Sequence, residues 1–482
     1  MRMPAKIMLL IASAVIALSG GADAFAQKNF SRGPSAIDRA PNASRGNDWP
    51  RGGERRPGWR VPGVIMTVPG MLPPGGPFID DDDDVISNNG PPRRQRSARR
   101  GPSGAPPAGE RRLVPDEVVI EVRNSVSATQ IDALQRRHRL TRLESQTFQL
   151  SGTTMFRWRI PDRRSVTTVV RALERDNLVA SAQPNYLFAM QADDAPPAAG
   201  EPAQYALAKL HLPQAHALAK GDDVRVAVID SAIDAQNAEL AGSIAASFDA
   251  LTAPMAPHKH GTAIAGLIAA HGRLMGAAPQ AKLLAVRAFD PNDNGAQGTT
   301  FSILKGLDWA AANGARVINM SFAGPNDPAL HRSLAAAHKK GIVLIAAAGN
   351  AGAKSPPLYP AADANVIAVS ATDSDDHLFE QSNRGKHIAI AAPGAQVLVV
   401  IPDGYEMASG TSFAAAEVSG IAALLLQRDP ALTPDKLRKI LESTAQDLGP
   451  KGRDIQFGFG LADAYAAVAA QSAPVARANA PR

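Results

Sequence analysis

A serine at position 412 stands where it could act as a nucleophile. It follows Gly410 and Thr411 and opens an alanine-rich apolar run that reaches residue 426, and Pro430 marks the end of the helix that this run predicts. Free N–H groups and the helix dipole favour negative charge at the start of a helix. A serine hydroxyl needs a base to take its proton, so a nucleophilic Ser412 requires a histidine and a carboxylate elsewhere in the chain. An ordinary N-cap serine is the alternative.

A carboxylate follows an apolar run upstream. Residues 226–229 read Val-Ala-Val-Ile, which is typical of a buried strand, and Asp230 comes directly after them. An aspartate in that place can hold an imidazole in one tautomer and stabilise the imidazolium that forms in a reaction. Asp234 is the rival, but it lies beyond the apolar run in a predicted loop, so we prefer Asp230. A cap or turn aspartate is the alternative.

A histidine opens the next predicted helix. His260 precedes the run Gly-Thr-Ala-Ile-Ala-Gly at 261–266, whose mostly small residues allow close packing around the helix start. Because its ordinary pKa lies near neutrality, a histidine can take a serine proton and return it to a leaving group. His258 is the rival, but it lies before the helix between Pro257 and Lys259 and lacks the small-residue context. A histidine with no chemical role is the alternative.

An asparagine follows another apolar run that is interpreted as a strand. Residues 346–349 read Ala-Ala-Ala-Gly, and Asn350 follows at the predicted mouth of the strand. Its amide N–H₂, together with the backbone N–H of Ser412, could hold the oxygen of a tetrahedral intermediate. A plain Gly-Asn turn is the alternative.

The elements that must position these residues alternate between strand and helix. Such alternation over about 204–470 predicts an α/β fold, a doubly wound parallel sheet covered on both faces. Ligands bind beyond the carboxyl ends of the strands in such sheets, and Asp230 and Asn350 fall there. The expected strands are 224–229, 282–288, 317–322, 342–347, 366–370 and 388–391, and the expected helices include 261–271, 300–313 and 327–340.

The four motifs together resemble the subtilisin family of serine endopeptidases. The order Asp, His, Ser along the chain distinguishes this family from chymotrypsin-like and α/β-hydrolase arrangements. Over 204–470 the resemblance implies a subtilisin-like sheet and peptide-bond hydrolysis through an acyl-enzyme on Ser412. It also implies His260 as general base and acid, Asp230 as the residue that orients it, and Asn350 as an oxyanion donor.

The resemblance extends to a substrate-binding strand. Ser321, Phe322, Ala323 and Gly324 match the segment that pairs with an extended peptide in this family. Further matches are the entry segment at 204–207 and the family landmarks at 359–362 and 382–385.

Departures from the family pattern remove no catalytic group. Ala232 replaces the usual glycine, Glu417 stands where a histidine is usual, and 235–239 replace a histidine-proline-aspartate run. They indicate a divergent branch. The resemblance implies that catalysis requires no cofactor. It leaves a structural calcium ion open, but the calcium sites cannot be traced residue by residue and no metal ligand is assigned.

The N-terminal residues 1–26 read as a secretory signal peptide. Arg2 and Lys6 form a basic start, residues 7–18 an apolar run, and Ala-Phe-Ala at 24–26 a cleavage site. The protein is therefore expected to be exported, to the periplasm, the cell surface or the medium. An uncleaved membrane anchor is the alternative.

The next segment, 27–112, is expected to be disordered. It holds 14 Pro and 13 Gly among 86 residues. Its acidic block at 80–84 could bind calcium, but a solvated charge run is the preferred interpretation. An arginine cluster at 93–100 could touch anionic surfaces, although a plain linker is preferred.

A small folded domain is expected at 113–190. Its elements are predicted at 116–122 (strand), 127–140 (helix), 148–150 and 155–160 (strands), 165–178 (helix) and 181–186 (strand). This order predicts a ferredoxin-like α+β fold. The domain is similar to the family's inhibitory propeptide, a chaperone for the slow parallel sheet. A free-standing binding domain is the alternative. Residues 191–203 would be a linker with a processing site, and 471–482 a flexible tail.

Composition excludes several classes of protein. The net charge of +6 does not suggest nucleic-acid binding, and the absence of cysteine excludes disulfides, thiolate catalysis and a lipid-modified cysteine. No segment of the mature chain is expected to span a membrane. The expected partners are protein or peptide substrates and the chain's own propeptide. Two alternatives remain open: a catalytically silent relative that binds peptides or partners, and an envelope-associated adhesion protein.

Overall fold

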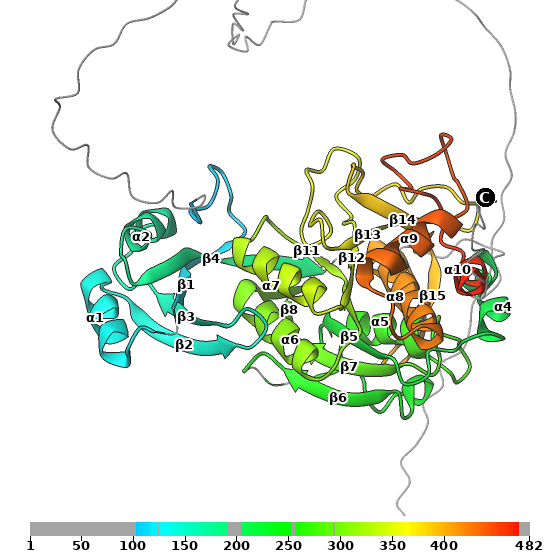
Figure 1. Ribbon diagram of the computed structural model, residues 1–482, viewed down its shortest axis with the longest axis horizontal. Helices are drawn as coiled ribbons and strands as arrows, with labels where there is room; N and C mark the ends of the chain where they lie inside the picture. The colour runs from blue at the N-terminus through cyan, green and yellow to red at the C-terminus, as the bar shows by residue number, and fades with distance from the viewer. Residues whose placement is uncertain are drawn as a thin grey trace, which may run out of the picture. The chain divides into compact units, whose positions relative to one another are not determined.

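The computed structural model describes residues 103–123, 125–190, 204–252, 254, 256–292 and 295–471 (Figure 1). The predicted signal peptide, the charged blocks at 80–84 and 93–100, the linker at 191–203 and the tail beyond residue 471 lie outside the described residues.

Residues 113–190 form an N-terminal subdomain with the predicted β-α-β-β-α-β element order. Its strands pair antiparallel in the order β2-β3-β1-β4. The two helices cover one face, where Trp158 and Leu134 are completely buried and α2 contributes an apolar stripe. The elements are β1 (Leu113–Val122), α1 (Ala128–His138), β2 (Thr141–Phe148), β3 (Thr153–Arg159), α2 (Val166–Leu173) and β4 (Val179–Met190).

Two boundaries of this subdomain differ from the prediction. Helix α1 ends at His138 because Arg139 takes a left-handed conformation with φ 54°, so β2 covers 141–148 where a strand was predicted only at 148–150. Most β2 residues are polar, so a search for apolar runs misses this strand. The described part of the chain also begins before 113, at Ser103. Ser103 Oγ and Gly104 N donate to the carboxylate of Glu174 at 2.8 and 2.6 Å, so the boundary predicted at 112 is too late.

A seven-stranded parallel sheet forms the centre of the second part, which we call the α/β domain. The strand order is β14-β13-β12-β10-β5-β7-β6, which confirms the predicted doubly wound parallel sheet. The six predicted strands are present, but the edge strand β6 was missed because its side chains are never fully buried. The strands are β5 (Arg225–Asp230), β6 (Ile244–Asp249), β7 (Lys282–Arg287), β10 (Val317–Met320), β12 (Val343–Ala347), β13 (Ile367–Thr372) and β14 (Ile388–Pro393).

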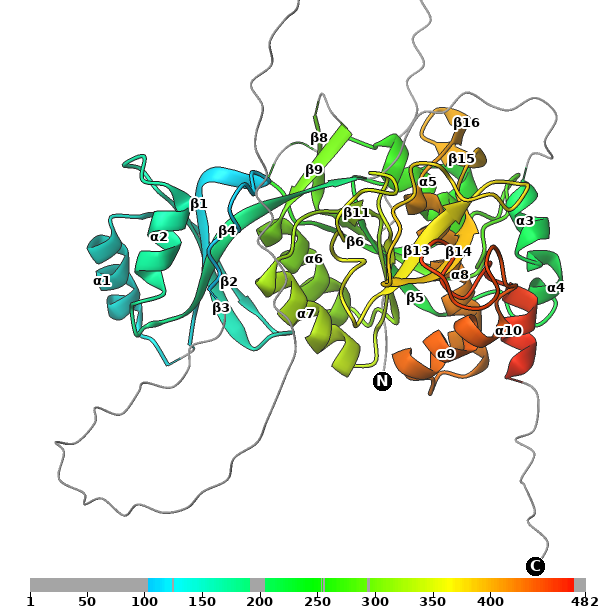
Figure 2. The ribbon, with the colours of Figure 1, turned by 90° about the horizontal axis from the view of Figure 1, so that it is seen from above.

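Helices cover both faces of this sheet. Side chains alternate along β5, so Val226 and Val228 pack in one apolar core while Ala227 and Ile229 pack in the other. Helices α5 (Lys259–Ala269) and α8 (Thr411–Arg428) contribute to the first core. Helices α6 (Thr300–Ala312) and α7 (Pro328–Lys339) contribute to the second, and they run side by side in Figure 2. Smaller elements complete the domain: α3 (Tyr205–Lys209), α4 (Leu212–His216), η1 (Ala238–Leu240), β15 (Val397–Ile401), β16 (Gly404–Ala408), α9 (Pro434–Thr444) and α10 (Ala464–Ala470).

The N-terminal subdomain packs against α6 and α7. Phe148, Met155 and Tyr186 share one apolar core with residues of the α/β domain, and the Phe148 ring meets the Phe301 ring edge-on at 5.9 Å.

Polar contacts reinforce this interface. Asp327, the N-cap of α7, accepts from Gln183 Nε2 at 2.7 Å. Lys305 Nζ donates to Glu144 Oε1 at 2.8 Å. The subdomain is therefore held by apolar and polar contacts to α6 and α7, the two helices that cover one face of the central sheet.

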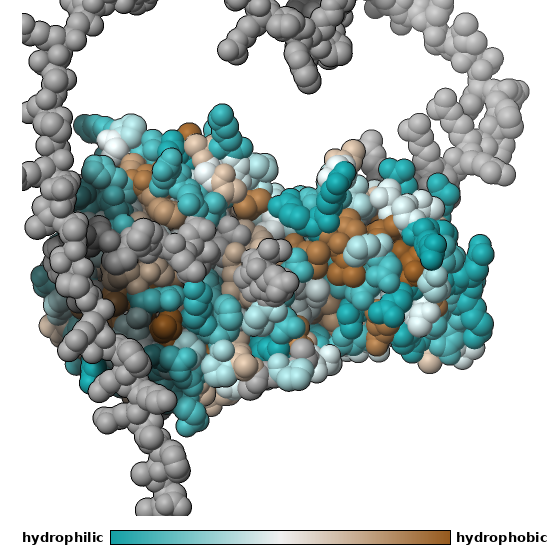
Figure 3. Space-filling model, turned by 180° about the vertical axis from the view of Figure 1, so that it is seen from behind, coloured by the Kyte–Doolittle hydropathy of each residue, from teal (hydrophilic) through white to brown (hydrophobic). Residues whose placement is uncertain are grey.

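Hydrophilic residues predominate on the face drawn in Figure 3, with hydrophobic residues in smaller groups. None of the helices in the described ranges has both the length and the hydropathy needed to cross a membrane. The exposed large hydrophobic side chains of the described part are Leu218, Met275, Tyr405, Ile455 and Tyr465.

Candidate active site

Asp230 is the last residue of β5, and only 1% of it is exposed at the carboxyl end of the sheet. Its Oδ1 accepts from the backbone N–H of Ser231 at 2.7 Å and lies 2.8 Å from Nδ1 of His260. A carboxylate can only accept, so the His260 ring must donate from Nδ1. The rival Asp234 instead accepts from Gln236 N in a local turn, at 3.0 Å.

His260 is the second residue of α5 and is 5% exposed. With its proton held on Nδ1 by Asp230, the ring keeps a lone pair on Nε2, the form that a general base needs. That Nε2 is buried and has no hydrogen-bond partner among the described residues. The ring centroid lies 6.0 Å from that of Phe413, the residue after Ser412, so the imidazole lies beside the start of α8.

Ser412 is the second residue of α8 and is completely buried. Its Oγ donates to the carbonyl oxygen of Ser321 at 3.1 Å, and Ser321 Oγ donates back to Ser412 O at 3.1 Å. The hydroxyl therefore points to Ser321 rather than to His260 Nε2. Catalytic hydrogen bonds are often unmade before substrate binds, and a χ1 rotation of Ser412 would redirect its proton.

Asn350 follows β12 and lies next to Ser412 at the carboxyl end of the sheet. Its Oδ1 accepts from Thr411 N at 3.1 Å and from Thr411 Oγ1 at 2.8 Å. The oxygen end of the amide is thereby fixed, which leaves the N–H₂ end as the donor. Gly349 takes φ +105°, and a Cβ there would lie 2.4 Å from Asn383 Nδ2, so this turn requires glycine.

The predicted substrate-binding residues form a strand that holds the chain's own segment. The strand predicted at 317–322 breaks at Ser321, and β11 (Phe322–Ala323) pairs antiparallel with the end of β4, in the register Phe322↔Met190 and Ala323↔Ala189. A Cβ on Gly324 would lie 2.2 Å from the Phe188 ring, so glycine gives that ring its space.

A second strand borders the same segment. Strand β9 (Gly295–Thr299) pairs with β4 at Leu187↔Thr299, Phe188↔Gly298 and Ala189↔Gln297, and β8 (Phe289–Asn292) extends this sheet. Residues 187–190 therefore lie as a β-strand between β9 and β11.

Sequence reasoning missed several residues that support the site. Ser231 and Thr411 hold Asp230 and Asn350 through the hydrogen bonds above, and both are neighbours of motif residues. Asn383 holds the turn before Asn350, because its Nδ2 donates to Ala348 O at 2.9 Å and its Oδ1 accepts from Ala351 N at 2.9 Å. The Ser-Asn-Arg-Gly run at 382–385 was the available signal for Asn383.

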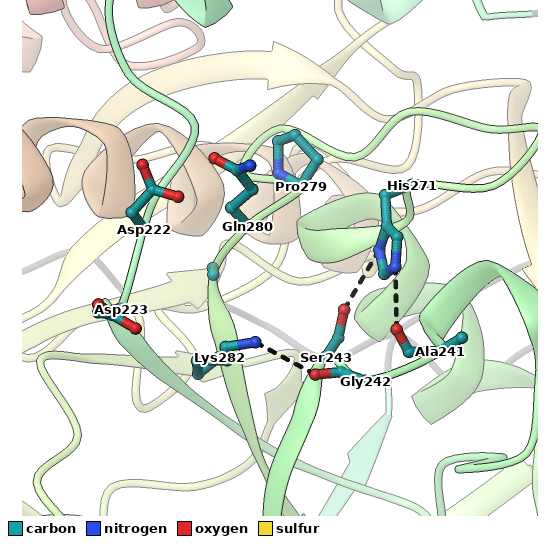
Figure 4. A pocket seen from close by; sticks show the side chains of 10 residues that line it. Asp222, Asp223, Ala241, Gly242, Ser243, His271, Pro279, Gln280 and Lys282 are labelled. Atoms are coloured by element: carbon teal, nitrogen blue, oxygen red, sulfur yellow. Dashed lines mark hydrogen bonds between the residues drawn. The ribbon is translucent and has the colours of Figure 1, made fainter.

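A hollow of about 400 Å³ lies away from these residues, at the amino ends of β5 and β7 (Figure 4). Its polar side chains are engaged locally: Lys282 Nζ donates to Gly242 O at 3.3 Å, and His271 Nε2 lies 3.0 Å from Ala241 O. The hollow is therefore at the opposite end of the sheet from Asp230. Within the described ranges, no group of three or more His, Cys, Asp or Glu side chains is placed to hold a metal ion.

Helix α8 also carries a buried carboxyl group. Glu417 is 3% exposed, and its Oε2 has no hydrogen-bond partner in the described part of the chain. Burial raises the pKa of Glu417 to about 8. The group is therefore predominantly neutral at pH 7.

We expect Glu417→Gln to flatten the pH dependence of stability. The wild-type carboxyl keeps its proton when folded but loses it above about pH 4.5 when unfolded, so folding stability should fall as pH rises from about 4.5 to about 8. This contribution is on the order of 3–5 kcal/mol, and glutamine lacks it. Urea unfolding at pH 5 and pH 8, with Ser412→Ala present in every form to prevent self-digestion, measures it. Exposed Glu380→Gln is the control, and an equal pH dependence with and without Glu417→Gln would contradict the prediction.

Comparison with known proteins agrees with this geometry. Residues 221–460 match the model of the family described as the Subtilase family. Thermitase of Thermoactinomyces vulgaris is 34% identical over 274 residues, which cover 55% of this chain and 95% of thermitase.

Two further likenesses are partial. The minor extracellular protease Epr of Bacillus subtilis is 38% identical over 261 residues, 52% of this chain but only 39% of Epr. The crystal structure of fervidolysin, a keratinolytic enzyme of Fervidobacterium pennivorans, superposes with a TM-score of 0.66 at 23% identity, over 78% of this chain and 63% of fervidolysin. That likeness concerns the fold. The breadth of the thermitase match, with the family match over the α/β domain, shows that the chain belongs to the subtilase family of serine proteases.

Proposed function

We propose that the protein is an exported serine endopeptidase made as a self-processing proenzyme. Ser412 is the nucleophile, His260 the general base and acid, and Asp230 the residue that orients His260. Asn350 Nδ2 and the backbone N–H of Ser412 hold the oxyanion. The buried 2.8 Å contact between Asp230 and His260, beside the helix that begins with Ser412, carries the proposal.

The reaction follows from these positions. Ser412 Oγ attacks the carbonyl carbon of the scissile peptide while its proton passes to His260 Nε2. The imidazolium is stabilised by Asp230 and returns the proton to the leaving amine. Water then attacks the acyl-enzyme, with His260 again as base, and regenerates Ser412. The substrate backbone would pair with 321–324 as residues 189–190 do.

We propose that the N-terminal subdomain is the inhibitory propeptide. Its last described residues, 187–190, occupy the β-strand position between β9 and β11 that a substrate would need. Its contacts with α6 and α7 bury apolar side chains and add hydrogen bonds, which supports a chaperone role in forming the parallel sheet. Cleavage in 191–203 would release it.

We infer export from the signal peptide predicted at 1–26 and from the similarity to Epr, which is named an extracellular protease. The segment 27–112 would link leader and propeptide. A catalytically silent relative that binds peptides is the remaining alternative. It requires an ordered triad without turnover, so processing and labelling experiments separate it from an enzyme.

N-terminal sequencing of the purified protein beside its Ser412→Ala form tests self-processing. The wild-type chain should begin between 191 and 204, because residues 187–190, which lie between β9 and β11, lead directly into the predicted linker. The Ser412→Ala chain should stay joined to its N-terminal subdomain. Equal processing of both forms after incubation in purified solution would refute self-cleavage.

Asn350→Ala should lower kcat by about 10²–10³-fold with little change in KM. The loss arises because the amide donor meets the oxygen only when that oxygen carries charge, and the magnitude is that of removing one oxyanion-hole donor from subtilisin. Steady-state kinetics on a chromogenic peptide measure it. A rise in KM at constant kcat would assign Asn350 to substrate binding instead.

A further inference from the structure

A second histidine lies behind the proposed catalytic pair. His258 is the N-cap of α5, and its Nδ1 accepts from the backbone N–H of His260 at 3.3 Å. The same Nδ1 lies 3.0 Å from Ser231 Oγ, which in turn lies 3.1 Å from Asp230 Oδ1. His258, Ser231 and Asp230 thus form a chain of contacts that ends on the carboxylate holding His260.

These contacts allow only one placement of the Ser231 hydroxyl proton. The backbone N–H of His260 has a fixed direction toward His258 Nδ1, so that nitrogen must carry a lone pair rather than a proton. Ser231 Oγ already accepts from Gly261 N at 3.1 Å and has a single proton to give. If that proton went to Asp230, the hydroxyl oxygen would face the Nδ1 lone pair at 3.0 Å without a hydrogen between them.

We propose that His258 is a positioning residue for the proposed catalysis, because it takes the Ser231 hydroxyl proton and so keeps that donor away from Asp230. This inference rests on the proposed function. Asp230 Oδ1 then accepts only from Ser231 N and His260 Nδ1. A carboxylate with fewer donors holds more negative charge against the imidazolium and makes His260 a stronger base.

The surroundings of His258 favour its neutral form, in which Nδ1 carries a lone pair. Burial and the neighbouring His260 lower the pKa of His258, and Lys259 acts in the same direction while Asp230 opposes it. Glu406 of β16 lies 3.7 Å from Lys259 Nζ and offsets part of that lysine's charge. The lowered pKa favours the neutral form of His258, whose Nδ1 can then accept a proton from Ser231.

Two substitutions that both preserve a helix cap test the proposal. His258→Asn keeps an acceptor oxygen two bonds from Cβ, at the place of Nδ1, whereas the hydroxyl of His258→Ser is one bond shorter. In the His258→Ser form the Ser231 proton should turn to Asp230. The acid limb of the kcat/KM profile should then move to lower pH by roughly 0.5–1 unit, while the His258→Asn form keeps the wild-type limb. Adding Ser231→Ala to His258→Ser should restore that limb.

An NMR titration of the His260 ring in the Ser412→Ala background gives the same answer without turnover. The His260 midpoint should fall with His258→Ser and stay unchanged with His258→Asn. Equal midpoints in both forms and the parent, or an equal shift in both, would overturn the proposal, because a cap alone or the loss of the imidazole would then explain the result. An inactive, unlabelled wild type would refute the proposed function and leave this titration to decide.

Discussion

Replacing Ser412 with alanine is expected to lower kcat for peptide hydrolysis by about 10⁶-fold, the scale measured for the nucleophile of subtilisin, a member of the same family. Without Oγ no acyl-enzyme can form, and the remaining oxyanion donors and binding strand supply only weak catalysis. Initial rates on a chromogenic peptide measure the loss. Because the Ser412→Ala chain is expected to stay joined to its N-terminal subdomain, both forms are first cut within 191–203 by an added protease and separated from that subdomain.

Ser419→Ala on the same helix is the matched control for that loss. Ser419 Oγ is buried, and its single proton has two acceptors within reach, Ala415 O at 2.8 Å and Asn319 Oδ1 at 2.9 Å. Its removal should cost on the order of 1 kcal/mol of stability and keep kcat within a few-fold of the wild type. A Ser412→Ala form that kept more than about a thousandth of wild-type kcat would mean that another group is the nucleophile.

Asp230→Asn should lower kcat by about 10⁴-fold at neutral pH. An amide at this position can present N–H₂ to His260 Nδ1, which favours the tautomer protonated on Nε2 and removes the base that Ser412 needs. The carboxylate that stabilises the imidazolium is lost as well. The pH dependence of kcat on a peptide substrate measures both effects, since the activity that remains should rise with pH as hydroxide replaces the missing base.

Asp234→Asn controls for the loss of one negative charge in the same region. Asparagine can still accept from Gln236 N, so the turn should survive and kcat should change less than about tenfold. Comparable losses in the Asp230→Asn and Asp234→Asn forms would show a general electrostatic effect and contradict the specific role of Asp230.

The sequence predicts the central sheet well because its buried strands are continuous apolar runs. Strand β5 and strand β12 lie within one residue of the expected positions, and each ends close to a site residue, Asp230 and Asn350. The edge strands β6 and β2 are harder to predict from the sequence. In β6, intermediate and exposed residues alternate, and in β2 most side chains are polar, so neither has the buried run that identifies a strand.

The break at Ser321 could not be read from the sequence. Residues 317–322 look like one strand, but Ser321 exchanges hydrogen bonds with Ser412 and the chain then turns to pair with β4. That pairing joins residues 322–323 to residues 189–190, far apart in the sequence. Local sequence pattern carries no information about such a partner, so the pairing of β11 with the end of β4 is a finding of the structure.

For the candidate site, sequence order identified the residue types and the structure supplies their contacts. The preference for Asp230 over Asp234 agrees with the hydrogen bond to His260. The link from His258 through Ser231 could not be foreseen, because it depends on the direction of one backbone N–H at the start of α5. Roles for all of these residues stay predictions until activity is measured.

Fluorophosphonate labelling followed by peptide mass mapping tests the central claim most directly. Such a probe reacts with a serine hydroxyl only where a base and oxyanion donors activate it. The account predicts one phosphonyl group per processed chain, on Ser412, and none on the Ser412→Ala form. Absence of an adduct on the processed wild-type chain, or an adduct on another serine such as Ser231, would contradict the account.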